Sequence, residues 1–597
     1  MNGHASTAPA LIGSRINKRF HREKSEDIVA LDNVSLEVRS GALTALVGPD
    51  GAGKTTLIRL AAGLMTPTSG DLQVLGIDVA ANPQQVQSRI GYMPQKFGLY
   101  GDLSVQENLD LYADLHGVSA DERKARYPGL MEMTALGPFA RRLAGRLSGG
   151  MKQKLGLACT LIRSPELLLL DEPTVGVDPL SRRELWAIIL NLVHEQGLTV
   201  LISTSYLDEA ERCGHVVVMH EGKVLAQGHP DEVSGLAANR VFLAEPSAGW
   251  TPRGLQARLL GNREVIDAVP EGGRVRLVMV AESGGQVLGS AAMTAAKARF
   301  EDGFMLLLRR ATPERRAAMM PLEHPTSAGG GQIVVEVSDL VRQFGAFTAV
   351  DHVSFEVRRG EMFGLLGPNG AGKTTTFRML CGLLGPTHGT LRVAGLDLHT
   401  ARAEARQRLG YVAQKFALYG DLSVAENLDF FASAYGLRGA RRRERIDWAL
   451  KEFELEPFVH QPSGKLPGGY KQRLAMAAAL LHEPEILFLD EPTSGADPLA
   501  RREFWRRITA LAEQGVTAIV TTHFMEEAEY CDHVAILDHG QVLARGTPAE
   551  IRSHAATVEV DDPTMEDAFI AIVEAGRGIG ADSTLGAGAA APSGHDR

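Results

Sequence analysis

The stretch Gly48-Pro-Asp-Gly-Ala-Gly53-Lys54-Thr55 fits the pattern G-x-x-x-x-G-K-[ST], and Gly367-Pro-Asn-Gly-Ala-Gly372-Lys373-Thr374 fits it again. Loops of this pattern wrap backbone N–H groups around nucleotide phosphates, and the next helix points its positive N-terminal end at them. Each loop follows an apolar stretch, 42–47 or 362–366, that is typical of a buried strand. The sequence therefore predicts two phosphate-binding loops, each in the strand–loop–helix context that the motif requires.

The chain of 597 residues carries two copies of a whole domain. Lys373 lies 319 positions after Lys54, and Glu491 lies 319 positions after Glu172. This repeat is much longer than the unit of a solenoid and matches the size of a complete domain. Strand and helix patterns alternate within each copy, which indicates an α/β fold. We therefore expect two related α/β domains in tandem.

The composition is that of an ordinary globular protein, with 44% hydrophobic and 22% charged residues. The net charge of −10 argues against a nucleic-acid surface, which is normally basic. We find no apolar run of about 18 residues that predicts a transmembrane helix, and residues 1–19 lack the apolar core typical of a signal peptide. The scattered Cys159, Cys213, Cys381 and Cys531 are expected to be buried thiols in a reducing compartment.

Two predicted strands end in paired carboxylates, Asp171-Glu172 and Asp490-Glu491. An aspartate at the end of a strand beside a phosphate loop is placed to hold Mg²⁺ through water. The neighbouring glutamate is then free to polarise an attacking water as a general base. The alternative is that these are surface acids at a turn, which the equal distance from the two phosphate loops disfavours.

These motifs together resemble ATP-binding cassette (ABC) proteins that carry two nucleotide-binding domains in one chain. Leu147-Ser148-Gly149-Gly150-Met151-Lys152-Gln153 is similar to the family's signature sequence, and the likeness covers about residues 15–240 and 332–575. The resemblance implies two P-loop domains of α/β fold. Each has a RecA-like core, a helical subdomain that carries the signature and an antiparallel β subdomain. It also implies ATP and Mg²⁺ as ligands.

The resemblance assigns roles outside the phosphate loops. Gln95 and Gln414 match a glutamine that senses Mg²⁺ and the γ-phosphate, and His523 matches a switch histidine. Phe344 matches the aromatic residue that stacks on adenine, and Phe20 is the weaker match in the first copy. The alternative for a lone aromatic residue is a place in the core. Asp178 and Asp497 match a loop that contacts the partner domain.

The expected site residues form three groups. The nucleotide-binding residues are Gly48, Gly51, Gly53, Lys54, Thr55, Thr56, Gln95, Ser148, Gly149, Gly150, Phe344, Gly367, Gly370, Gly372, Lys373, Thr374, Thr375, Gln414, Gly468 and Gly469. The Mg²⁺ residues are Thr55, Gln95, Asp171, Thr374, Gln414 and Asp490. The catalytic residues are Glu491, His523 and Glu172.

The segments that follow the two glutamines, 96–109 and 415–428, are near copies rich in apolar and aromatic residues. In ABC transporters this region lies against the membrane subunit, and the sequence here is similar to the exporter branch that includes drug-efflux ATPases. An apolar surface loop suits a docking groove for a partner helix; core packing between subdomains is the alternative. The resemblance therefore implies integral membrane permease subunits as partners, no nucleic acid, and a peripheral place on the inner face of the cell membrane.

Two positions depart from the family pattern. Ser205 stands where His523 stands in the second copy, and Pro467 replaces the serine that Ser148 provides in the first. In the family the two cassettes pair head to tail, and each ATP lies between the phosphate loop of one and the signature of the other. Both departures then fall in one composite site, although the alternative is harmless drift. Proline lacks a hydroxyl and a backbone N–H, but it starts a helix well.

The domain organisation follows from composition and from one displaced repeat. Phe300-Glu-Asp-Gly-Phe304 recurs as Met565-Glu-Asp-Ala-Phe569 at a shorter offset than the phosphate loops, so the first copy carries an insert within about 240–299. Residues 274–280 alternate partly like a strand. We expect a disordered tail (1–14), a first cassette (15–239), its extension with an accessory insert (240–320), a linker (321–331), a second cassette (332–575) and a disordered tail (576–597).

The sequence thus predicts the tandem ATPase subunit of a membrane exporter, with one consensus and one degenerate composite ATP site. A soluble tandem cassette acting on ribosomes or nucleic acid is the alternative. Such proteins usually carry a long, charged, helical linker, whereas residues 240–331 are nearly charge-balanced and interrupted by Gly and Pro. A non-catalytic scaffold is a third possibility, which the complete set of residues in the second copy disfavours.

Overall fold

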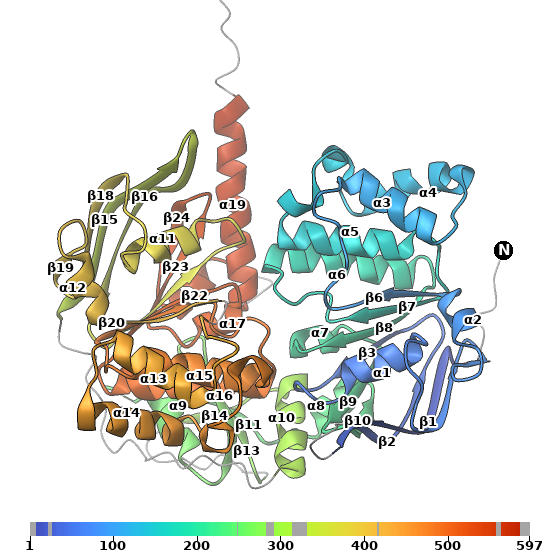
Figure 1. Cartoon of the computed structure of the whole chain (residues 1–597), viewed down its shortest axis with the longest axis horizontal. Helices are drawn as coiled ribbons and strands as arrows, with labels where there is room; N and C mark the ends of the chain where they lie inside the picture. Colours follow the sequence, from blue (N-terminus) through green and yellow to red (C-terminus); the bar gives the residue numbers. More distant parts are fainter. Residues whose placement is uncertain are drawn as a thin grey trace, which may run out of the picture.

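The computed structural model describes residues 8–21, 27–247, 249–281, 292–312, 331–414, 417–556 and 563–585. Within these ranges the chain forms two cassettes of the same α/β architecture, side by side in Figure 1, the first on the right and the second on the left. The predicted α/β fold is confirmed. Lys415, Phe416 and all but the last residue of the predicted linker 321–331 lie outside the described residues.

A six-stranded sheet forms the core of each cassette, in the order β10-β9-β3-β8-β7-β6 in the first and β20-β21-β22-β17-β23-β24 in the second. The first sheet comprises β3 (Leu43–Val47), β6 (Ile90–Met93), β7 (Leu167–Asp171), β8 (Thr199–Thr204), β9 (His215–His220) and β10 (Lys223–Gly228). The second comprises β17 (Met362–Leu366), β20 (Leu409–Val412), β21 (Ile486–Asp490), β22 (Thr517–Thr522), β23 (His533–Asp538) and β24 (Gln541–Gly546). The parallel strands β3, β7, β17 and β21 are buried throughout, which explains their continuous apolar sequences.

Helices cover these sheets, and the two that follow the phosphate loops begin at the loop lysines. The first cassette has α1 (Lys54–Ala61), α2 (Pro83–Gln87), α6 (Pro179–His194), α7 (Leu207–Glu211) and α8 (Pro230–Gly235). The second has α11 (Lys373–Leu380), α12 (Arg402–Gln407), α16 (Pro498–Glu513), α17 (Met525–Ala528) and α18 (Pro548–Ser553). The strand–loop–helix context of both phosphate loops is therefore present.

Two smaller subdomains complete each cassette. An antiparallel sheet contains β1 (Leu11–Phe20), β2 (Ile28–Val38), β4 (Ser69–Val74) and β5 (Ile77–Asp78) in the first and β15 (Ile333–Phe344), β16 (Phe347–Arg358), β18 (His388–Val393) and β19 (Leu396–Asp397) in the second. The helical subdomain contains α3 (Val105–Leu115), α4 (Ala120–Met133) and α5 (Gly149–Leu161), or α13 (Val424–Ala434), α14 (Gly439–Glu452) and α15 (Gly468–Leu480). The two helical subdomains lie at opposite corners of the molecule (Figure 1), so the cassettes run in opposite directions.

The insert of the first copy folds into a small α/β unit. It consists of β11 (Val241–Ala244), α9 (Pro252–Leu260), β12 (Val265–Glu271), β13 (Arg274–Met279) and β14 (Met293–Ala295), in the sheet order β12-β13-β11-β14. Strand β13 lies where the alternation from Arg274 predicted a strand. The unit packs beneath the second cassette, with α9 against α16 (Figure 1). Arg253, on α9, is buried against Glu513, Asp532 and the carbonyl of Gly360 at 3.1, 2.7 and 3.0 Å.

Each copy ends in a helix, α10 (Phe300–Ala311) or α19 (Met565–Leu585). Two expected boundaries need correction. Strand β1 begins at Leu11, because its residues pair with both β2 and β4, so the ordered part of the first cassette starts inside the predicted tail 1–14. Helix α19 continues to Leu585, beyond the predicted boundary at 575.

In the described ranges, no helix combines the length and apolarity needed to cross a bilayer. The four cysteines are buried and free, as predicted.

Candidate functional site

The first phosphate loop is closed on its own lysine. Gly53 precedes α1 with φ 102°, and a Cβ there would lie 2.6 Å from the carbonyl oxygen of Ala30, so the position requires glycine. The ammonium group of Lys54 donates to the carbonyl oxygens of Gly48 and Pro49 at 2.6 and 3.2 Å. It also lies 3.4 Å from Glu172. Protein oxygen atoms thus hold the buried ammonium group of Lys54 in the loop. The oxygens of a bound anion can replace them.

The carboxylates at the end of β7 lie directly beside this loop. The hydroxyl of Thr55 donates to Oδ1 of Asp171 at 3.0 Å, and Ser203 donates to the same oxygen at 2.7 Å. Oδ2 of Asp171 is buried and has no hydrogen-bond partner among the described residues. Gln95 donates to Glu172 at 2.7 Å. Four predicted site residues of the first copy therefore lie together beside the phosphate loop: Thr55, Gln95, Asp171 and Glu172.

The second loop repeats this geometry and adds a histidine. Lys373 donates to the carbonyls of Gly367 and Pro368 at 2.6 and 3.0 Å. Gln414 donates to Glu491 at 2.6 Å, and Nδ1 of His523 lies 3.3 Å from the same carboxylate.

Two pKa shifts follow from this arrangement. Burial alone would raise the pKa of Glu491, but His523, Lys373 and Gln414 bring it below its usual value, so the carboxylate is ionised at neutral pH. Burial raises the pKa of Asp490, against the opposing effect of its hydrogen bond from Thr521.

The two signature sequences start their helices differently. Ser148 caps α5, its hydroxyl accepting the N–H of Met151 at 3.2 Å. Pro467 occupies the same place before α15 and makes no side-chain cap. Helix α15 nevertheless begins at Gly468, with Pro467 as its N-cap residue. The glycine N–H groups are present in both copies, and the serine hydroxyl in one.

Each phosphate loop faces the signature of the other cassette. The N–H of Asp50 donates to Asp497 at 3.1 Å, and a Cβ on Gly468 would lie 3.9 Å from Oδ2 of Asp50. On the opposite side, a Cβ on Gly149 would lie 3.7 Å from Nδ2 of Asn369. The structure thus brings the first loop to the second signature and the second loop to the first.

The sequence is similar to known proteins over both cassettes. The model of the family described as "ABC transporter" matches residues 31–175 and 350–494. "Probable multidrug ABC transporter ATP-binding protein YbhF" of Escherichia coli (strain K12) is 50% identical over 565 residues, which cover 94% of this chain and 96% of that protein. The chain belongs to the ABC family.

A second relative matches one cassette. "Nod factor export ATP-binding protein I" of Ralstonia nicotianae is 43% identical over 250 residues, covering 42% of this chain and 78% of that protein. Two ABC domains in one chain make this protein a tandem ABC ATPase, a nucleotide-binding enzyme that hydrolyses ATP.

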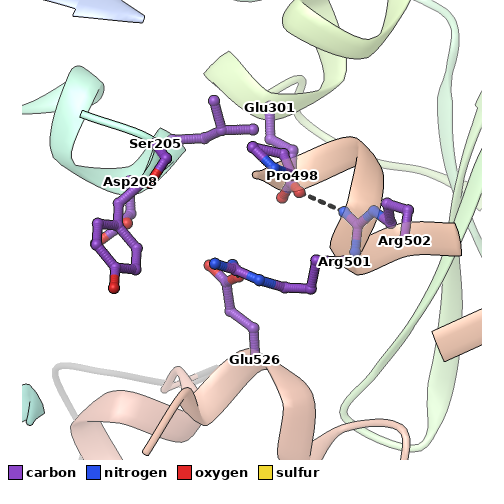
Figure 2. A pocket seen from close by; sticks show the side chains of 9 residues that line it. Ser205, Asp208, Glu301, Pro498, Arg501, Arg502 and Glu526 are labelled. Atoms are coloured by element: carbon purple, nitrogen blue, oxygen red, sulfur yellow. Dashed lines mark hydrogen bonds and ion pairs between the residues drawn. The ribbon is translucent and has the colours of Figure 1, made fainter. Parts of the chain in front are cut away.

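The two ABC cassettes also meet around their switch positions. Ser205 and His523 are both buried, and the residue after each, Tyr206 or Phe524, packs against the other with ring centroids 5.7 Å apart. The Arg501 guanidinium lies 4.5 Å from the Phe524 ring. A pocket beside this contact is lined from both cassettes and by α10 (Figure 2). The two switch regions are therefore in direct contact through aromatic side chains.

The terminal helices tie the cassettes together crosswise. Glu301 of α10 pairs with Arg502 of the second cassette (Figure 2). Glu566 of α19 pairs with Arg182 of the first cassette at 2.6 Å. Burial raises the pKa of Glu301 to about 7, against the lowering effect of Arg502. The repeated Glu-Asp motif of the two copies thus supplies one interface ion pair in each direction.

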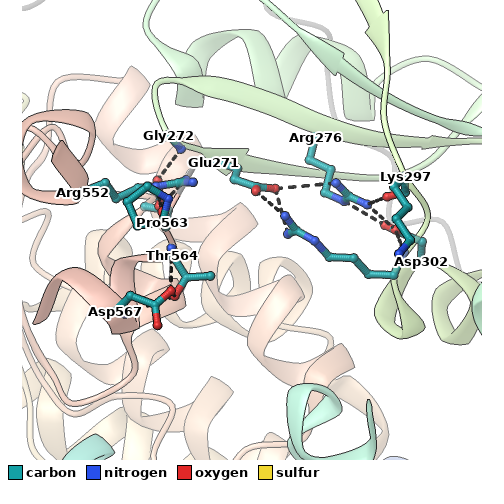
Figure 3. A network of polar contacts seen from close by, with 11 residues as sticks. Glu271, Gly272, Arg276, Lys297, Asp302, Arg552, Pro563, Thr564 and Asp567 are labelled. Atoms are coloured by element: carbon teal, nitrogen blue, oxygen red, sulfur yellow. Dashed lines mark hydrogen bonds and ion pairs between the residues drawn. The ribbon is translucent and has the colours of Figure 1, made fainter. Parts of the chain in front are cut away.

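A cavity of about 620 Å³ lies between the cassettes and the insert, lined largely by charged side chains. Figure 3 shows Gly272, in the β12–β13 turn, near Arg552 of the second cassette, and Glu271 directed toward Arg276, which also pairs with Asp302. The N–H of Gly272 donates to Glu529 at 2.8 Å. An interface this polar resembles the domain interfaces that permit relative motion.

The expected adenine residue and one tyrosine of each predicted docking segment lie at the surface, whereas Val105, Leu109, Val424 and Leu428 of those segments are buried. Phe344 ends β15 and is 48% exposed, with Arg342 stacked 4.6 Å from its ring centre, so it is not a core residue. In the segments after the glutamines, Tyr100 and Tyr419 are 58% and 49% exposed. The ring centroids of Tyr419 and Phe430 are 4.6 Å apart. These surfaces are open to a ligand or a partner.

The sequence reasoning missed one loop residue, Asp50. Desolvation at the cassette interface, with the nearby Asp497 carboxylate, raises its pKa to about 6, although the side chain keeps contact with solvent. Comparing the two loops at their constant offset would have found it, because the second loop has Asn369 at this position.

Proposed function

We propose that this chain is the ATP-hydrolysing subunit of an ABC exporter, in which two head-to-tail composite sites hold ATP between its cassettes. The observation that carries the proposal is the reciprocal approach of loops and signatures, Asp50 to Gly468 and Asn369 to Gly149. The names of YbhF and of the Nod factor export protein support the exporter branch. Similarity to YbhF over both cassettes favours a transporter over a ribosome-acting protein.

The second composite site carries the main catalytic activity. The N–H groups of the second loop cradle the α- and β-phosphates, and Lys373 reaches the β- and γ-phosphates. The ionised carboxylate of Glu491 accepts a proton from the attacking water. A hydrogen bond from Gln414 at 2.6 Å positions it, and Nδ1 of His523 lies 3.3 Å away. From the facing cassette, Ser148 and the N–H groups of Gly149 and Gly150 donate to the γ-phosphate. Positioning and charge stabilisation of this kind are the catalytic elements of P-loop enzymes.

The donor set fits Mg²⁺. Oδ2 of Asp171 is buried without a hydrogen-bond partner in the described residues, and the hydroxyl of Thr55 lies beside its other oxygen. Thr55, Asp171 and Gln95 would hold the ion in the first site, and Thr374, Asp490 and Gln414 in the second. When bound, Mg²⁺ neutralises charge on the β- and γ-phosphates. Phe344 would stack on adenine in the second site, and its exposure leaves the ring face open for this role.

The first composite site is degenerate. Its phosphate loop, Glu172 and Gln95 are complete, but Pro467 offers neither a hydroxyl nor an N–H, and Ser205 is too short to take the place of a histidine. Losing one preorganised donor lowers the rate by roughly 10²–10³ in other hydrolases. We infer that this site binds nucleotide and turns it over slowly at most.

Integral membrane permease subunits are the partners that this function requires. The exposed aromatic residues Tyr100 and Tyr419 lie in the segments that follow Gln95 and Gln414, and they suit docking against an apolar helix. A permease bound there would place the chain peripherally on the inner face of the cell membrane. Binding energy from nucleotide-driven closure of the cassettes would then reach the permease through the same segments.

The test is co-sedimentation with membranes that contain the permease. Tyr100→Glu combined with Tyr419→Glu is expected to move the chain into the supernatant while nucleotide binding stays unchanged, because two charges would be placed against an apolar partner. Val280→Glu, which alters an exposed apolar residue of the insert, is the control and should stay with the membranes. Membrane association that survives the double substitution contradicts docking through these segments.

A further inference from the structure

The two phosphate loops differ at a single position. Residues 48–56 and 367–375 are identical except that Asp50 in the first loop corresponds to Asn369 in the second. An amide side chain offers two N–H donors, whereas an ionised carboxylate offers acceptors and a negative charge. The two side chains have nearly the same shape, so the difference changes the charge of the loop and leaves its fold intact.

Both side chains point at the signature of the opposite cassette. Oδ2 of Asp50 lies 3.9 Å from where a Cβ on Gly468 would be, and Nδ2 of Asn369 lies 3.7 Å from the equivalent point on Gly149. In the proposed composite sites, this gap between loop and signature glycines receives the terminal phosphate. The side chain at this position therefore faces the γ-phosphate and not the β-phosphate, which the loop N–H groups enclose.

The charges around Asp50 strengthen this effect. Glu172 and the Asp497 carboxylate lie near it, and Lys54 is the cation that offsets them. The first site thus departs from the second at three places that all face the γ-phosphate: Asp50, Ser205 and Pro467. Its phosphate loop is otherwise unchanged. Such a pattern preserves binding of a diphosphate and selects against a third phosphate.

We propose that Asp50 sets the nucleotide preference of the first composite site: its carboxylate disfavours a γ-phosphate between the Lys54 loop and Gly468, so that this site retains a nucleoside diphosphate in preference to the triphosphate. The inference rests on the proposed composite sites. Repulsion between like charges falls with distance, so the carboxylate acts on the γ-phosphate of ATP more strongly than on ADP, which has no group at that place.

The experiment measures Mg·ADP and Mg·AMP-PNP binding to the full-length chain with one loop disabled. In Lys373→Ala, where the first loop alone is intact, ADP should bind more tightly than AMP-PNP. Adding Asp50→Asn should tighten AMP-PNP by at least about tenfold and change ADP by less than about threefold. The mirror pair uses Lys54→Ala, in which Asn369→Asp should weaken AMP-PNP by a similar factor and leave ADP unchanged. Melting temperatures check that each variant is folded.

The outcomes separate this inference from the function on which it rests. If Lys373→Ala binds nucleotide and Asp50→Asn does not change the ratio of ADP affinity to AMP-PNP affinity, the proposed role of Asp50 is wrong. That result would leave the composite sites standing. Equal changes in ADP and AMP-PNP affinity also overturn it, because the carboxylate would then act on the whole loop. If Lys373→Ala binds neither nucleotide, the first loop is not a nucleotide site and both proposals fail.

Discussion

The backbone N–H of Asp50, in the phosphate loop of the first cassette, donates a 3.1 Å hydrogen bond to the carboxylate of Asp497, 447 residues further along the chain. Asp497 also accepts the N–H of Ala500 at 2.9 Å and so caps the start of α16. One carboxylate therefore joins the loop of one cassette to a helix of the other. This hydrogen bond must therefore break when the cassettes separate.

Burial of Asp50 at the cassette interface, together with the nearby Asp497 carboxylate, predicts a pH-dependent stability. The folded-state pKa of Asp50 is raised from 3.8 to about 6, so its contribution favours the folded state at low pH and is lost as pH rises through about 6. Asp50→Asn should therefore raise the melting temperature above pH 7 and leave it nearly unchanged below pH 4. The gain should be about 1 kcal/mol, because solvent contact screens the interaction. A gain of equal size at both pH values would rule out ionisation as the cause.

Turnover at saturating ATP should depend on the two glutamates unequally. Glu491→Gln should lower kcat at least about 10²-fold, because it removes the base of the complete site. Glu172→Gln should lower kcat much less. Ser148→Ala should resemble Glu491→Gln, since the two residues face one ATP from opposite cassettes. Equal losses for the two glutamate variants would mean two competent sites or strict coupling, and either would remove the single-active-site interpretation.

Restoring the degenerate site should need both missing donors. In the Glu491→Gln background, Pro467→Ser alone should add little activity, because Ser205 still lacks the reach of a histidine. Pro467→Ser together with Ser205→His should raise the residual turnover measurably. Activity that stays flat in the double restoration would place the defect elsewhere in the first site, with Asp50 as the remaining difference in its loop.

Nucleotide stoichiometry should report on each loop separately. Lys54→Ala and Lys373→Ala each remove a cation that meets the β- and γ-phosphates, so bound nucleotide should fall from about two to about one per chain in either variant. Equilibrium dialysis with Mg·ADP is the suitable measurement, since it avoids turnover. A value that stays near two in both variants would refute the assignment of the loops.

The insert should stabilise the second cassette through Arg253. Arg253→Met removes the cation from two poorly exposed carboxylates, Glu513 and Asp532, and should destabilise the chain by about 3–5 kcal/mol. Arg89→Met is a matched control, because its ion pair with Glu166 is solvent-exposed and should contribute less than about 1 kcal/mol. Urea unfolding followed by tryptophan fluorescence compares the two variants. Similar small losses would show that the Arg253 contact is not needed.

Much of each site could be predicted from the sequence because its motifs are short and locally determined. The phosphate loops follow buried strands, Asp171 lies beside Thr55, and Gln95 reaches Glu172, as their spacing and the resemblance implied. The opposed orientation of the cassettes came from the resemblance alone, since no local pattern in the sequence encodes how two domains pair.

The place of the insert could not be predicted. Its partners for Arg253 lie 260 and 279 positions away, in the other cassette, and a partly alternating strand such as β13 indicates a sheet without indicating what covers it. The start of β1 was misjudged for a similar reason, because its hydrogen bonds are made to strands further along the chain.

The packing of the insert has a consequence for how the two halves can be inherited and recombined. The insert belongs to the first copy, and its helix α9 covers α16 of the second cassette. A second copy made alone would therefore expose the surface around Glu513. A chimera that exchanges first halves between relatives must therefore match the donor's insert to the recipient's second cassette. The two halves are copies of one domain, but one half can no longer replace the other.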